Sequence, residues 1–368
     1  MKLKVCILVL ICSVSAVVHS LEENLFFDLL YTFRQVAPST INQFKFPDIL
    51  ANNKDVKYHF NDQDKLESIN INVSKEQRKT ITYHLDKQFT RQNTGSSTQS
   101  EWINNGIKLT AYNLTNSIKI ERAFFNGKGK LDLPKETVIL SFLQANVYNN
   151  GKMQDVYLLG YQEDYDSPFF NSTWLYTDEQ DGVNETIQYL DSIGYDYKMS
   201  SFPASSIHLD EFKADHHYIL ITAFAGSAGW SQNFILLDGS NKNFNTILHS
   251  FELSFLSFNC RYESDYKAMV YFLDGEKLYF DLNKESFDEV GVYKDGQLII
   301  DEESNQLWGE LIVDTQIKKV NTLKDKMALV LSQQPRGPAN YIRAGTIESW
   351  LMLDGNSWKL IKREAISF

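Results

Sequence analysis

Residues 269–282, with the sequence MVYFLDGEKLYFDL, indicate the fold class of this chain. Two apolar and aromatic runs, 269–273 and 278–282, lie on either side of the dipeptide Asp274-Gly275. Asp-Gly tolerates the positive φ angles of a tight hairpin turn, whose twist matches that of the flanking strands. We therefore predict an antiparallel β-hairpin at this position.

The same turn signal recurs along the chain after Trp102. The other dipeptides of this kind are Asn150-Gly151, Asp238-Gly239, Asp295-Gly296 and Asp354-Gly355. Strand signals do not alternate with helix signals, which disfavours a parallel α/β sheet. Three of the turns share the pattern LLDG, FLDG or MLDG, but their spacing is too irregular for a repeat family. We predict a mostly β, antiparallel, hairpin-rich body, arranged either as a propeller or as stacked sandwiches.

An amphipathic helix is predicted near the N-terminus, over residues 21–36. Its apolar stripe at helical spacing consists of Leu25, Phe26, Leu29, Leu30 and Phe33. Pro38 follows and cannot continue a helix. We expect this stripe to dock on a sheet, although a lipid held in a β cavity beneath it is an alternative.

Between this helix and Trp102 the apolar period changes to two. Ile69, Ile71 and Val73 alternate with polar residues, and so do Ile81, Tyr83 and Leu85. Both segments are predicted to be strands with one wet face. The polar stretch 91–100 is interpreted as a linker, or alternatively as a hairpin tip. We expect residues 21–92 to form a small α+β unit and residues 101–368 to form the β-rich body.

The first twenty residues have the features of a signal peptide. Lys2 and Lys4 precede an apolar run over residues 5–11, and Val18-His19-Ser20 places small residues at the cleavage positions. The run is shorter than the roughly 20 residues needed to span a bilayer. We therefore expect cleavage after Ser20, a secreted, extracellular protein, and no membrane span.

Four N-x-[ST] sequences support this expectation. Their acceptor residues are Asn72, Asn113, Asn171 and Asn184. Behind a signal peptide they predict N-glycans at exposed positions.

Cysteine usage excludes an intrachain disulfide from the exported chain. Of three cysteines, Cys6 and Cys12 lie in the expected signal peptide, which leaves Cys260. A secreted protein without disulfides must be stabilised by a packed core. The apolar neighbours of Cys260 favour a buried, inert thiol over a reactive one.

Composition limits the partners. The chain has 368 residues, of which 43% are hydrophobic, and a formal net charge of -11. This length and hydrophobicity suit a large core, and the acidity argues against nucleic acid or an anionic lipid surface as partner. We expect an extracellular protein or a glycan as partner, and neither a cofactor nor a bound metal.

The predicted binding segment has the sequence YQEDYD. Its candidate residues are Tyr161, Glu163, Asp164, Tyr165 and Asp166. Aromatic rings stack on sugars and carboxylates accept hydrogen bonds from hydroxyl groups, while a pair of acids could also cleave a glycosidic bond. The alternative is a charged loop whose neighbouring aromatic residues, such as Phe170, turn into the core.

Ser227 is a weak catalytic candidate, within the small-residue sequence AGSAG. Small residues suit a nucleophile elbow, but an elbow joins a strand to a helix. Here strand-like residues 234–237 follow instead, so a tight turn is favoured.

A second cluster raises the question of a metal site. It consists of His208, Asp210, Asp215, His216 and His217. Imidazole and carboxylate groups ligate zinc, but adjacent His216 and His217 would point to opposite faces of an extended chain. We therefore interpret the cluster as a solvated polar loop.

These residues favour a secreted, glycosylated, non-catalytic binding protein, with a glycan as a possible ligand. The alternative is a secreted hydrolase, either a glycosidase that uses Glu163 or an esterase that uses Ser227.

Overall fold

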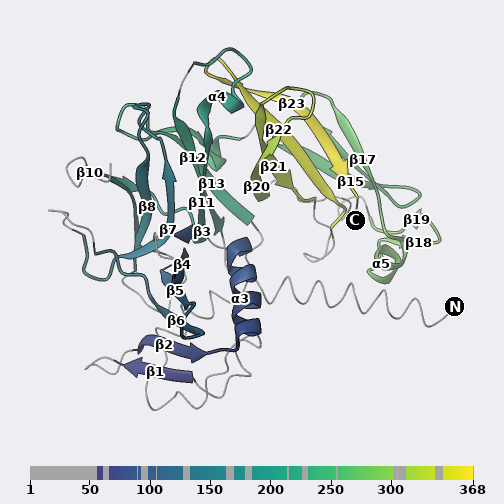
Figure 1. Ribbon diagram of the computed structural model, residues 1–368. Helices are drawn as coiled ribbons and strands as arrows, with labels where there is room; N and C mark the ends of the chain where they lie inside the picture. Colours follow the sequence, from purple (N-terminus) through teal and green to yellow (C-terminus); the bar gives the residue numbers. More distant parts are fainter. Residues whose placement is uncertain are drawn as a thin grey trace. The chain divides into compact units, whose positions relative to one another are not determined.

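The computed structural model describes most of the chain after residue 55 (Figure 1). The described residues are 56–60, 66–88, 90–92, 98–104, 106–126, 133–162, 170–178, 185–213, 215–225, 231–253, 256–301, 305, 312–335 and 343–367. The expected signal peptide and the helix expected over residues 21–36 lie outside this set. Among the described residues, no helix has the length and apolarity needed to cross a membrane.

The chain divides into two compact units. The first comprises Met1–Gln144, Asp155–Ser192 and Asp196–Lys198, and the second comprises Ala145–Gln154, Ile193–Tyr195 and Met199–Phe368. The strand pairs of the sheets are antiparallel, so the prediction of a mostly β, antiparallel fold is confirmed.

A six-stranded sheet in the order β1-β2-β6-β5-β4-β3 opens the first unit. Its strands are β1 (Val56–Phe60), β2 (Leu66–Asn72), β3 (Thr90–Gln92), β4 (Gln99–Asn104), β5 (Ile107–Tyr112) and β6 (Ser117–Arg122). Ile69 lies opposite Ile120, which lies opposite Leu109, and all three are buried. Alternate residues of a strand share a face, so this row forms the core of the sheet. The strand predicted around Ile69 and Ile71 is confirmed.

The strand predicted at Ile81, Tyr83 and Leu85 is wrong, because these residues lie in helix α3 (Lys75–Gln88). Ile81 and Leu85 are 6% and 4% exposed, whereas Tyr83 is 57% exposed. Burial therefore follows the i, i+4 spacing of a helix. The helix starts with a capping box in which Ser74 Oγ accepts from the Gln77 N–H and Gln77 Oε1 accepts from the Ser74 N–H. These two bonds satisfy backbone donors that the helix itself leaves free.

The sheet also contains strands from both sides of the linker expected at 91–100. β3 pairs with β4, and Gln92 lies opposite Glu101. The boundary expected between residues 92 and 101 therefore does not coincide with the division between the two units.

A second sheet of the first unit has the order β10-β9-β8-β7. Its strands are β7 (Val138–Ala145), β8 (Gln154–Tyr161), β9 (Ser172–Asp178) and β10 (Glu185–Leu190). It joins the first sheet through the backbone, since the Ile139 N–H donates to the Ala123 carbonyl and the Gly106 N–H donates to the Ile139 carbonyl.

The described residues of the second unit form four sheets. Their strand orders are β11-β12-β13-β14, β15-β16-β17, β18-β19 and β20-β21-β22-β23. The strands are β11 (Tyr195–Pro203), β12 (His217–Ala225), β13 (Ser231–Asp238), β14 (Asn245–His249), β15 (Phe258–Glu263), β16 (Lys267–Phe272), β17 (Lys277–Asp281), β18 (Tyr293–Lys294), β19 (Gln297–Leu298), β20 (Ile312–Lys319), β21 (Met327–Gln333), β22 (Thr346–Asp354) and β23 (Ser357–Ile366). Short helices accompany them: α4 (Ala204–Ile207), η2 (Ser250–Glu252) and α5 (Lys284–Glu289).

The turn signals have different outcomes. Asp274-Gly275 connects β16 to β17, with Gly275 at φ 88°, so the hairpin that indicated the fold class is confirmed. Asp295 and Gly296, at φ 52° and 83°, form the two-residue turn between β18 and β19. Asp238-Gly239 instead begins a longer connection to β14.

Leucine-rich strands of two sheets make the main core of the second unit. Leu220 and Leu236 of one sheet belong to the same buried cluster as Leu329, Leu331 and Leu351 of another. Burying this much aliphatic surface is the dominant favourable contribution to folding.

Arg363 joins β23 to the β16–β17 hairpin. Its guanidinium donates to Asp274 Oδ2 and Glu276 Oε2, each at 2.6 Å, and lies 3.8 Å from the centroid of the Phe272 ring. The side chain is 2% exposed. The charged partners and the ring together allow this guanidinium to be buried.

Candidate functional site

One face of the β10-β9-β8-β7 sheet is aromatic. Tyr157 lies opposite Tyr176, and Trp174 lies opposite both Leu159 and Tyr189. Because directly opposite residues point to the same side, one face carries the aromatic residues. We call it the aromatic face, and it comprises Tyr157, Tyr161, Trp174, Tyr176 and Tyr189.

The two faces of this sheet differ in burial. The other face carries Val156, Leu158 and Leu175, none of which is exposed. On the aromatic face burial varies along the strands. Leu159 and Tyr176 are 0% and 3% exposed in a buried cluster, whereas Trp174 is half-buried and Tyr189 is 56% exposed. The sheet therefore presents aromatic side chains at an accessible edge, since β10 ends the strand order.

Ring contacts hold the aromatic face together. Trp174 and Tyr189 meet edge to face with their centroids 6.3 Å apart, and Tyr157 lies 5.8 Å from Tyr176 and 4.7 Å from Phe142. Offset and edge-to-face arrangements are the ones that aromatic pairs favour. The face thus holds two groups of contacting rings, one formed by Trp174 and Tyr189 and the other by Tyr157, Tyr176 and Phe142.

Carboxylates lie beside this array. Asp155 is directly opposite Asp178 and lies two residues before Tyr157 on β8. Both carboxylates are therefore on the same face of the sheet as Tyr157. Burial, followed by the negative charges of Asp155 and Asp178, raises the pKa of Tyr157 to about 12. Gln144 Nε2 donates to Asp155 Oδ1 at 2.7 Å. Acceptors and amide groups therefore lie near the apolar rings.

The predicted binding segment begins on this face. Tyr161 is half-buried at the end of β8, and its carbonyl accepts from the Asn171 N–H at 2.9 Å. Phe170 is buried at 3% exposure, in agreement with the alternative that neighbouring aromatics turn into the core. The remaining candidates, Glu163, Asp164, Tyr165 and Asp166, lie outside the described residues.

Trp174 and Tyr189 were missed by sequence reasoning as binding candidates. A signal for them exists, because Tyr157, Leu159 and Tyr161 alternate along one strand, as Trp174 and Tyr176 do along the next. What the sequence does not show is that these strands are neighbours.

The glycan acceptors occupy different environments. Asn72 and Asn171 are exposed, at the end of β2 and at the start of β9. Asn113 is half-buried in the β5–β6 turn, where its Oδ1 accepts from Arg78 Nη1. Asn184 lies outside the described residues.

Ser227 also lies outside the described residues, but the strands on either side of it are described. In the pairing of β12 with β13, Tyr218 lies opposite Asp238 and Ala225 lies opposite Ser231. The next element described after this position of the chain is therefore strand β13, whereas a nucleophile elbow requires a helix after the strand.

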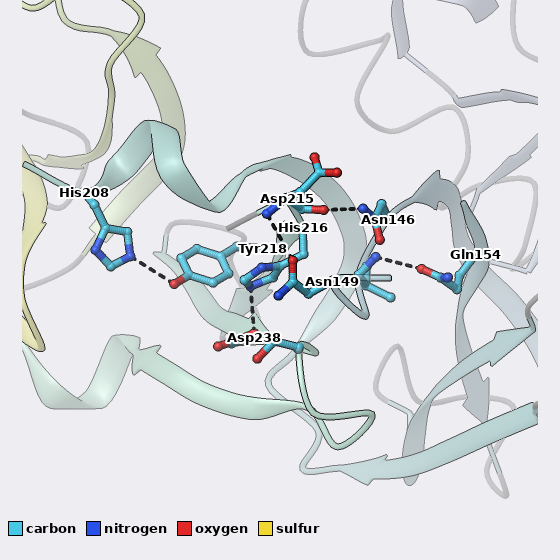
Figure 2. A network of polar contacts seen from close by, with 10 residues as sticks. Asn146, Asn149, Gln154, His208, Asp215, His216, Tyr218 and Asp238 are labelled. Carbon is cyan, nitrogen blue, oxygen red and sulfur yellow. Dashed lines mark hydrogen bonds and ion pairs between the residues drawn. The ribbon is translucent and has the colours of Figure 1, made fainter. Parts of the chain in front are cut away.

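The histidine-rich segment is not a solvated polar loop at two of its positions (Figure 2). His208 and His216 are 4% and 3% exposed. His208 Nε2 lies 3.0 Å from Tyr218 Oη, and its ring stacks on Phe212 with the centroids 3.8 Å apart. The loop interpretation is therefore wrong for both histidines, because Phe212 and Tyr218 pack on His208 and Asp238 of β13 bonds to His216.

His216 has a charged partner. Its Nε2 lies 3.0 Å from Asp238 Oδ1. Burial would raise the pKa of Asp238, but the hydrogen bonds from His216 and from the Ser240 N–H outweigh burial and lower it.

The tip of the β7–β8 hairpin is attached to the same segment (Figure 2). The His217 N–H donates to the Asn146 carbonyl at 2.7 Å, and Asn146 Nδ2 donates to the Asp215 carbonyl. The Asp215 N–H in turn donates to Asn149 Oδ1 at 3.1 Å. Within the described ranges, no three histidine, cysteine or acidic side chains are placed to hold a metal ion.

Cys260 is buried in β15 as a free thiol. Burial raises its pKa well above the ordinary range. The prediction of a buried cysteine is confirmed, and a thiol that stays protonated is a poor nucleophile.

Comparison with known proteins adds little to this picture. No protein-family model matches the chain, and no curated protein matches it. A solved structure titled "Crystal structure of exotype rhamnogalacturonan lyase YesX" is similar over 74% of this chain and 42% of that chain, with 7% identity and a TM-score of 0.30. This chain thus spans less than half of that protein, and a likeness of this size carries no argument about fold or activity.

Proposed function

We propose that this protein is an exported, glycosylated, non-catalytic binding protein that recognises a glycan through the aromatic face. The observation that carries the proposal is the pair formed by Trp174 and Tyr189, with Tyr189 56% exposed on the edge strand β10. Exposed aromatic groups with a polar rim are typical of ligand-binding surfaces.

The chemistry of the face suits a sugar. The apolar sides of a pyranose ring pack on aromatic rings, and its hydroxyl groups donate to carboxylates such as Asp155 and Asp178. Tyr161 extends the face towards the predicted binding segment. Rings that already pack against a neighbour, as Trp174 and Tyr189 do, bind at lower entropic cost than loose side chains.

An array of neutral and acidic oligosaccharides tests the proposal with the purified, full-length exported protein. We expect Trp174→Ala and Tyr189→Ala each to weaken binding about five- to thirtyfold, since a lost stacking contact costs roughly 1–2 kcal/mol. Tyr279→Ala is the matched control, because Tyr279 is also a strand tyrosine that is 56% exposed. It should leave binding unchanged.

Two outcomes would contradict the proposal. One is the absence of binding to every sugar on the array, and the other is equal affinity of the wild type and both aromatic variants. Circular dichroism of each variant shows whether it is folded. Turnover of nitrophenyl glycosides or esters that is lost in Glu163→Ala or Ser227→Ala would identify a hydrolase instead.

Export and glycosylation are tested separately. The N-terminal sequence of the secreted protein should begin at Leu21, and peptide-N-glycosidase should lower its mass. Retention of the first twenty residues in the cell-associated product would count against export.

For the fold, both the propeller-like and the stacked-sandwich arrangement of the body stay predictions. The four-stranded sheets β11–β14 and β20–β23 support either, because both architectures are built from such antiparallel sheets.

A further inference from the structure

Residues 204–216 connect β11 to β12 and also bond to β22 within the second unit. We call this segment the clasp. The Ala204 N–H donates to the His216 carbonyl at 2.9 Å, which closes the clasp on itself. The Leu209 N–H donates to the Leu353 carbonyl of β22 at 2.7 Å. The clasp therefore bonds to the β20–β23 sheet while its two ends belong to the β11–β14 sheet.

The side chain of His208, within the clasp, points toward Tyr218 (Figure 2). It is 4% exposed and makes its hydrogen bond, at 3.0 Å, with the neutral hydroxyl of Tyr218 on β12. One ring face is covered by Phe212, almost parallel to it at an interplanar angle of 2°. A neutral imidazole suits this environment, because an ion there would lose most of its hydration.

Charged groups face His208 from several elements. Asp210 of the clasp has Oδ1 3.5 Å from His208 Nδ1, and Asp238 of β13 acts from a longer distance. The Lys326 ammonium group, between β20 and β21, donates to the His208 carbonyl at 2.6 Å. Asp210 is 50% exposed, so water screens its attraction for an imidazolium ion.

The net effect of these groups and of burial is a lowered pKa of His208. Burial lowers the pKa of His208, the Asp210 carboxylate raises it in part, and Lys326 lowers it further. The closed clasp therefore binds a proton less readily than the open one does, in which the histidine has its ordinary pKa of about 6.5. Stability contributed by the neutral histidine is present above that value and is lost as the pH falls below it.

We propose that the clasp opens at acidic pH because His208 becomes protonated. His216, at the other end of the clasp, bonds to a different element, since its Nε2 lies 3.0 Å from the Asp238 carboxylate of β13. Opening releases the bond from Leu209 to β22 and exposes Phe212.

Hydrogen exchange of the full-length protein tests the proposal at pH 7.5 and 5.5, with rates corrected for intrinsic exchange. We expect protection of the Leu209 and Ala204 amides to fall up to about tenfold, the linkage expected for one proton taken up with a pKa near 6.5. The Val270 amide in β16 is the internal control and should change little. Equal protection of the clasp amides at both pH values would overturn the proposal.

Two variants identify the group. His208→Gln keeps an amide that can bond to Tyr218 but cannot titrate, so the pH dependence should disappear. His59→Gln replaces an exposed histidine of β1 and should leave it intact. If the protection of the clasp amides still depends on pH in His208→Gln, another group is responsible.

A direct titration covers the case in which His208→Gln does not fold. In NMR spectra of the wild type, the His208 ring signal should titrate below pH 6.5. A midpoint at or above 6.5 would overturn the proposal.

Discussion

Gly345 is a residue that no other amino acid can replace without moving its neighbours. Its φ of +156° is reached by few L-residues, and an added Cβ would lie 2.3 Å from Phe280 Cδ1 and 2.5 Å from the Ile366 carbonyl oxygen. The glycine thus allows the segment before β22 to pass against β17 and β23.

We expect Gly345→Ala to lower the free energy of unfolding by about 2–4 kcal/mol, through backbone strain and overpacking together. Urea denaturation followed by circular dichroism measures this change. Gly151→Ala is the control, since Gly151 has φ +71° with nothing within 4 Å of the added Cβ. It should cost only about 1 kcal/mol, and equal losses in the two variants would contradict the steric argument.

Single residues also show where sequence reasoning ends. The burial of Cys260 was predictable, because its own neighbours in the chain are apolar. The burial of His208 was not, since the segment that carries it is bonded to residues far along the chain, such as Lys326, which lies 118 residues away and donates to the His208 carbonyl. A cluster of polar residues has the same local pattern whether it is solvated or covered by distant strands.

At the scale of elements, α3 depends on a local start signal. Ser74→Ala removes the hydroxyl oxygen that accepts from the Gln77 N–H. We expect it to lower the free energy of unfolding by about 1 kcal/mol, the usual contribution of an N-cap. Thermal or urea denaturation measures the loss.

The control for this variant lies in the same helix. Thr80 is exposed, and its hydroxyl donates to the Glu76 carbonyl. Thr80→Ala should be neutral or slightly stabilising, because alanine has the higher helix propensity. A loss in Thr80→Ala as large as that in Ser74→Ala would show that the cap is not the cause.

Hairpins were predictable from sequence where the turn residues themselves define the geometry, as Asp274-Gly275 and Asp295-Gly296 do. The strand prediction over Ile81–Leu85 failed because three alternating residues fit a strand and a helix almost equally well. The signal that separates the two is the capping box of Ser74 and Gln77, two turns before Ile81.

For the whole molecule, the cysteine content predicts stability that does not depend on oxidation. Cys260 is the one cysteine after the expected signal peptide, and it is a free thiol. We expect the same melting temperature for the secreted protein with and without dithiothreitol. A structural disulfide would contribute about 2–5 kcal/mol, so a fall of several degrees on reduction would contradict the expectation.

The division of the molecule into units was not predictable from local patterns. The polar stretch 91–100 resembles a linker, but the strands beside it pair within one sheet. Composition marks where the chain is polar, whereas sheet membership is decided by pairing between strands that are distant in sequence. For the same reason the aromatic face could be recognised only after β8, β9 and β10 were known to be adjacent.

The contact of Arg363 with Asp274 and Glu276 has a consequence for biosynthesis. A nascent chain emerges from the ribosome at about 5–20 residues per second, and its N-terminal parts fold first. The β16–β17 hairpin is therefore made well before its cationic partner, which lies 89 residues after Asp274. Until that arginine emerges, the two carboxylates repel each other and the Phe272 ring lacks its cover, so this part of the second unit closes only late in translation.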